Sequence, residues 1–121
     1  MKVEIVLKKD LFENIGVEVS QLYCNINENS DVSINGSCLL KDSKKLEKHA
    51  LDIKANLCDE QGNILYVMDS RSNLKFTLRN YEVFTLFMVN ASRFFDINEL
   101  HHIQLHPSIK KERIRNTDPF S

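Results

Sequence analysis

Apolar and polar residues alternate along residues 49–58, and this pattern restricts the possible folds more than any other feature of the chain. One side of the alternation holds Leu51, Ile53, Ala55 and Leu57, and the other holds Asp52, Lys54 and Asn56. A period of two residues is typical of a β-strand with one buried face. A polar break containing Gly62 follows at residues 59–63, and an apolar run resumes at Ile64. The stretch from His49 to Met68 therefore predicts a β-hairpin closed by a short glycine-containing loop.

Similar short apolar runs recur along the rest of the chain. They predict strands at residues 2–8, 17–26, 32–40, 74–78 and 81–89, and a last strand that runs into Pro107. Within the run at residues 32–40, Gly36 indicates a β-bulge or a close approach of the backbone to another group. Proline cannot donate a hydrogen bond to a sheet, so we expect the last strand to end at Pro107. Residues 91–100 fit either a short helix or a loop.

These runs amount to about eight short strands with turn residues every eight to twelve positions, which is typical of a β-sandwich or a small barrel. We therefore expect an all-β, immunoglobulin-like β-sandwich of seven or eight mostly antiparallel strands, with a small β-barrel as the alternative. The length of 121 residues suits one domain. We assign the sandwich to residues 1–109 and a polar C-terminal tail to residues 110–121.

The segment from Tyr81 to Val89 is the most hydrophobic part of the chain and is apolar on both faces. One face holds Val83, Phe87 and Val89 with Thr85, and the other holds Phe84, Leu86 and Met88 with Glu82. A strand of a two-layer sandwich normally has one solvent-exposed face, so we expect another segment of the chain or a partner to bury the second apolar face. We predict that the core contains Ile53, Leu57, Phe76 and Phe87. The opposite face, Phe84, Leu86 and Met88, is then an interface, or it lies under a lid formed by residues 91–100 or by the stretch around Leu11 and Phe12.

The charge balance argues against several kinds of partner. The formal net charge is −1, which gives no overall attraction to nucleic acid or to an anionic membrane. The basic cluster Lys110, Lys111, Arg113 and Arg115 lacks stacking aromatic residues apart from Phe120, so we interpret it as a solvated tail. No apolar run approaches the roughly 18 residues of a membrane helix. The N-terminal residues lack the features of a signal peptide, and the expected location is cytoplasmic.

One stretch resembles a known family. Residues 51–66, LDIKANLCDEQGNILY, resemble the strand and turn of bacterial immunoglobulin-like sandwich domains of the FxLYD type. In that motif an alternating strand leads into a tyrosine–aspartate pair and a glycine turn. Leu57 and Asp59 agree with the motif, whereas Ala55 replaces its phenylalanine and Cys58 replaces its tyrosine. The resemblance implies a sandwich; members of the family are usually exported modules behind a signal or lipid anchor, which we do not recognise at this N-terminus.

Few residues suggest chemistry. His102 and His106 share one face of the last predicted strand and could supply two metal nitrogens, but a metal site needs further ligands, so we predict no metal. The cysteines Cys24, Cys38 and Cys58 lack CxxC spacing and are expected to be buried free thiols. Nucleophile-elbow, phosphate-loop and HExxH motifs are absent, and no cofactor is expected.

The sequence therefore favours a non-catalytic protein-interaction module or subunit in an unidentified process. Its expected partner is another protein or a second copy of the chain in a homodimer, with no nucleic acid and no membrane. Whether the chain is an enzyme stays open, with a non-catalytic role preferred. The alternative is a small enzyme or ligand-binding β-barrel whose polar site includes His102 and His106.

Overall fold

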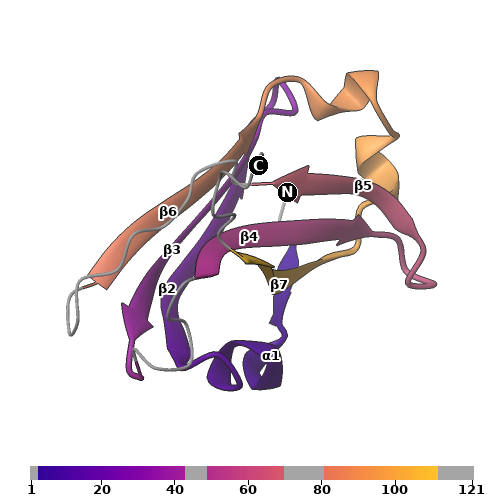
Figure 1. The fold of residues 1–121 in the computed structure, drawn as a ribbon. Helices are drawn as coiled ribbons and strands as arrows, with labels where there is room; N and C mark the ends of the chain where they lie inside the picture. The colour runs from indigo at the N-terminus through magenta and orange to yellow at the C-terminus, as the bar shows by residue number, and fades with distance from the viewer. Residues whose placement is uncertain (1–2, 43–48, 70–80, 112–121) are drawn as a thin grey trace, which may run out of the picture.

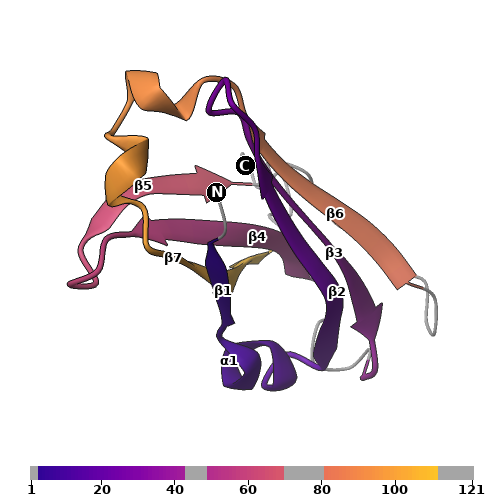
Figure 2. The same cartoon turned by 180° about the vertical axis from the view of Figure 1, so that it is seen from behind.

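The chain folds into two facing β-sheets, shown from opposite sides in Figures 1 and 2. The computed structural model describes residues 3–42, 49–69 and 81–111. The four-stranded sheet has the order β1 (Glu4–Leu7), β7 (His102–Lys111), β4 (His49–Cys58) and β5 (Ile64–Asp69). The three-stranded sheet has the order β2 (Val17–Ile26), β3 (Val32–Leu40) and β6 (Tyr81–Met88). The pairings are antiparallel except that of β1 with β7, so the predicted sandwich is confirmed.

The order of the strands differs from that of an immunoglobulin domain. The last two strands of an immunoglobulin domain are neighbours in one sheet. Here β6 belongs to the three-stranded sheet and β7 to the four-stranded sheet, so the chain crosses between the sheets after β6. The crossing contains two short 3-10 helices, η1 (Ala91–Arg93) and η2 (Ile97–Glu99), where the sequence allowed a short helix or a loop. The helix α1 (Lys9–Glu13), which the sequence analysis missed, joins β1 to β2 at the opposite end of the sandwich.

The predicted hairpin is confirmed as β4 and β5. All four apolar residues of its alternating face, Leu51, Ile53, Ala55 and Leu57, have no exposed surface. The turn is held by Asp59, whose carboxylate accepts a hydrogen bond from the backbone N–H of Asn63 at 2.8 Å. Gly62 has φ +87°, a conformation that side-chain-bearing residues rarely adopt. The core prediction is thus correct for Ile53 and Leu57, whereas Phe76 lies outside the described residues.

The central strand β3 shows why the two sheets fit together. Its inward residues Val32, Ile34 and Cys38 are fully buried, and Gly36 lies between them. A Cβ atom on Gly36 would lie 2.5 Å from Cζ of Phe84, so only glycine leaves room for that ring. The predicted close approach is therefore present at Gly36. The β-bulge of this sheet lies instead in β2, between Ser20 and Tyr23.

The two faces of β6 are the reverse of the sequence prediction. Phe84, Leu86 and Met88 point into the core, with exposed fractions of 1%, 1% and 8%. Phe87, predicted to be buried, is exposed. The register explains the reversal, because Leu86 pairs with the inward residue Ile34 and Phe87 pairs with the outward residue Ser33. The three residues predicted as an interface are therefore buried within the chain itself.

Pro107 does not end β7, which runs on to Lys111 and past the predicted domain boundary at residue 109. The prediction was wrong because it did not take account of the neighbours of β7. On one side, β1 pairs with β7 only as far as Leu105. Beyond that residue β7 is an edge strand on that side, where a missing N–H costs no ladder hydrogen bond, while Pro107 stays in register with Ile53 of β4.

Candidate functional site

The outer faces of the two sheets differ in chemistry. The outer face of the four-stranded sheet is mostly polar and carries charge, with Glu4, Lys54, Asn56, Asp69, His102, Gln104 and His106. Its exposed large apolar side chains are Ile64 (56%) and Val67 (46%), both on the edge strand β5. On the outer face of the three-stranded sheet, four large side chains are exposed, namely Tyr23 (58%), Val83 (70%), Phe87 (59%) and Val89 (55%). Together with the polar residues Ser33, Asn35, Ser37 and Thr85 between them, these side chains form the surface that we name the open face.

The polar residues of the open face hydrogen-bond to one another or to a neighbour on β2. The Thr85 hydroxyl donates to Oδ1 of Asn35 at 2.8 Å, and Nδ2 of Asn35 donates to the Ser33 hydroxyl at 3.0 Å. The Ser37 hydroxyl donates to Oε1 of Gln21, the residue at the β2 bulge, at 3.0 Å. Polar groups that already have partners lose less free energy when a surface is covered than unpaired groups do. The open face can therefore be taken out of water at low cost.

The end of the open face is fixed by Asp31, which lies between β2 and β3. Its carboxylate accepts a hydrogen bond from the backbone N–H of Asn90 at 2.8 Å and another from Nδ2 of Asn27 at 3.1 Å. The Ser30 carbonyl also accepts a hydrogen bond from the N–H of Ala91, at 2.8 Å. These contacts hold the chain just after Val89 against the β2–β3 turn.

We expect Asp31 to titrate below its ordinary pKa of 3.8, because the hydrogen bond from Asn90 and then that from Asn27 favour the ionised carboxylate. A lowered pKa in the folded state stabilises the fold above the ordinary value, and this contribution is lost as the pH falls through the lowered pKa. NMR titration of the Asp31 carboxyl carbon checks this. A pKa at or above that of the unfolded chain would contradict the hydrogen bonds.

The two candidate histidines lie on the polar outer face of the four-stranded sheet. They are four residues apart on β7, a separation of roughly 13 Å along a strand. Nδ1 of His102 lies 2.9 Å from Nδ1 of His101, and Nε2 of His106 lies 3.4 Å from Oδ1 of Asn56. The structure does not bring His102 and His106 together around one ion. Within residues 3–42, 49–69 and 81–111, no group of three or more potential ligands converges on a metal position.

We expect the melting temperature of the protein to be the same with and without a chelator, because two separated histidines and isolated cysteines do not form a closed metal site. Differential scanning calorimetry in the presence of EDTA checks this. Stoichiometric zinc in the purified protein that is lost on His102→Ala or His106→Ala replacement would contradict it.

The cysteines are free thiols with little reactivity. Cys38 and Cys58 are buried, as predicted, whereas Cys24 is half-buried. Burial raises the pKa of the Cys38 thiol to about 12, so it stays protonated at neutral pH. These properties suit structural cysteines rather than nucleophiles.

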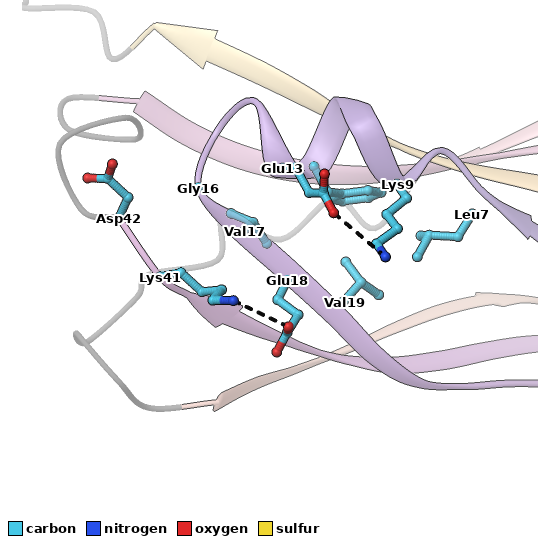
Figure 3. Close-up of a pocket in the computed structure, with 10 residues that line it drawn as sticks. Leu7, Lys9, Glu13, Gly16, Val17, Glu18, Val19, Lys41 and Asp42 are labelled. Atoms are coloured by element: carbon cyan, nitrogen blue, oxygen red, sulfur yellow. Dashed lines mark ion pairs between the residues drawn. The ribbon is translucent and has the colours of Figure 1, made fainter.

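A pocket of about 460 Å³ lies between α1, the start of β2 and the end of β3 (Figure 3). Its apolar wall includes Phe12 and Val17, and its charged rim contains two ion pairs. Nζ of Lys9 lies 3.7 Å from Glu13, and Nζ of Lys41 lies 3.6 Å from Glu18. Exposed pairs of this kind contribute about 0–1 kcal/mol each. The size suits a small ligand, and Asp42 adds a third carboxylate to the lining beside the two ion pairs.

The comparisons with known proteins identified no relative. No protein-family model matches the chain, and neither the curated proteins nor the solved structures include a significant match. The resemblance of residues 51–66 to FxLYD domains therefore stays a prediction. Among the described residues, no helix is long and apolar enough to cross a membrane.

The exposed apolar face of β6 contains Val83 and Phe87, whereas the residues predicted for it, Phe84, Leu86 and Met88, are buried. The sequence analysis also missed Tyr23, which joins the open face from β2. A usable signal was present in β3, where polar Ser33 and Asn35 alternate with apolar Val32 and Ile34 and so identify the outward side of the sheet. The basic cluster beginning at Lys110 lies outside the residues whose side chains are described.

Proposed function

We propose that this chain is a non-catalytic protein-interaction module or subunit that binds a protein partner through the open face. The observation that carries the proposal is the contrast between the outer faces of the two sheets. One is mostly polar and charged, with Ile64 and Val67 exposed among charged and amide side chains, and the other exposes Tyr23, Val83, Phe87 and Val89 with only uncharged residues between them. A contiguous exposed apolar patch is typical of protein interaction sites. Aromatic residues such as Tyr23 and Phe87 are the types enriched in interfaces.

The alternative, an enzyme or a ligand-binding barrel, has less support. Its proposed residues His102 and His106 lie on an outer sheet face, and neither lines the pocket beside α1. The two sheets are separate rather than closed around a lumen. We propose binding as the chain's activity, with a protein partner in the cytoplasm and with neither nucleic acid nor membrane.

Site-specific photo-crosslinking in the cells that naturally produce the chain tests this proposal. A benzoylphenylalanine residue replaces Phe87 in one variant and the exposed Val67 of β5, on the opposite outer face, in the control. The proposal predicts a discrete protein adduct from position 87, either with a second copy or with another protein, and none of comparable yield from position 67. Absence of a discrete adduct from position 87, or equal yields from both positions, would contradict it.

A further inference from the structure

The open face itself holds no charged residue among the described residues, although the outer surface of the same sheet includes Glu18 of β2, which lies opposite the outward residue Leu39 of β3. The nearest charges are at its edge, where Glu18 is paired with Lys41 at 3.6 Å. Glu82 has the parity of the inward residues Phe84 and Leu86 and so does not belong to the open face. A partner that presents a strongly charged surface would lose hydration there and find no opposite charge in return.

From this we propose that the partner seated on the open face is a second copy of the chain, packed face to face; the inference rests on the proposed function. Two identical charged surfaces repel each other, but two copies of the open face bring no like charges together. The net charge of −1 per chain adds little repulsion at longer range. Two copies of the open face can therefore pack against each other without charge repulsion.

The hydrogen bonds of the open face support the same partner. Because Thr85 donates to Asn35 and Ser37 donates to Gln21, part of the polar row already has hydrogen-bond partners within the chain. A second copy brings a surface whose polar groups are satisfied in the same way, so both sides are desolvated at low cost. The exposed Val83 and Phe87 side chains then provide the apolar contact.

Face-to-face packing is also the ordinary way in which two sheets associate, with a spacing of about 10 Å and strands within about 30° of each other. A dimer of this kind has two-fold symmetry, so each residue of the open face occurs twice in the interface. A single charged substitution therefore places two like charges at the contact. Its effect on association is larger than that of one charge.

Sedimentation velocity of the full chain across about 1 to 500 micromolar, the range that resolves micromolar dimers, tests the inference. The matched variants are Val83→Lys on the open face and Val67→Lys on β5, both at exposed valines in strands. We expect a concentration-dependent dimer for the wild type and for Val67→Lys. We expect Val83→Lys to raise the dissociation constant by at least about 100-fold, as charge burial at a symmetric contact implies, while its circular dichroism spectrum stays unchanged.

Three outcomes would overturn the inference. A wild type that is monomeric at every concentration excludes a second copy as the partner. Equal loss of the dimer in Val83→Lys and Val67→Lys would place the contact elsewhere. Unfolding of Val83→Lys would mean that another segment of the same chain covers the face. If the wild type is monomeric but position 87 crosslinks to a different protein, this inference fails and the proposed function stands. If the wild type is monomeric and position 87 gives no discrete crosslink, both the inference and the proposed function fail.

Discussion

Replacing Leu86 with lysine is expected to unfold the chain. Leu86 is 1% exposed and lies opposite Ile34 in the register of β3 and β6, so a lysine there would place an unpaired ammonium group in the core. Burying an unpaired charge costs several kcal/mol, against a total stability of about 5–15 kcal/mol for a small domain. Circular dichroism should show the loss of β-structure and of a cooperative thermal transition.

The neighbouring position 87 supplies the control for this prediction. Phe87→Lys changes the adjacent residue of the same strand, but its side chain is exposed and its ammonium group stays in water. We expect this variant to keep the wild-type spectrum. A folded Leu86→Lys variant together with an unfolded Phe87→Lys variant would mean that the β6 faces are exchanged.

Truncation of Leu57 to alanine is expected to destabilise the protein by about 2–5 kcal/mol, the range for large-to-small changes in a core. Leu57 has no exposed surface and lies in β4, which pairs on one side with β5 and on the other with β7. Because β4 is hydrogen-bonded on both sides, the backbone around the cavity can collapse only partly. Urea denaturation followed by circular dichroism measures the change in the free energy of unfolding.

Val67→Ala is the matched control for Leu57→Ala. Val67 lies on β5, the neighbour of β4, but it is exposed on the polar outer face. Surface substitutions of this kind usually change stability by no more than about 0.5 kcal/mol. A change below about 0.5 kcal/mol for Leu57→Ala itself would show that the assignment of its strand face is wrong.

Where the residue types alternated clearly, the sequence was sufficient to predict the strands. In β4 the polar residues Asp52, Lys54 and Asn56 separate the apolar ones, so the buried face could be chosen from local pattern alone. In β6 this contrast is missing, because Phe84 and Phe87 lie on opposite faces. Local pattern cannot choose between two apolar faces; the choice is made by pairing with β3, which is a contact between residues about fifty positions apart in the sequence.

The same limit applies to the ends of elements and to the arrangement of the sheets. Whether Pro107 ends a strand depends on the parallel partner β1, which lies near the other end of the chain. The helix α1 has five residues, too few to show a helical repeat, and its formation is supported by the burial of Phe12. The composition of the open face could be predicted only in part, since Tyr23 reaches it after a bulge that shifts the register of β2.

The most direct test of the account is the exposure of the open face in solution as the protein concentration rises. Paramagnetic relaxation of methyl signals by a soluble gadolinium chelate reports which side chains meet solvent. The account predicts strong relaxation of Val83 and Val89 in dilute protein and protection of both at high concentration, with Val67 exposed and Leu86 protected throughout. Protection of Val83 and Val89 at every concentration, equal to that of Leu86, would show that the chain covers this face itself and would contradict the account.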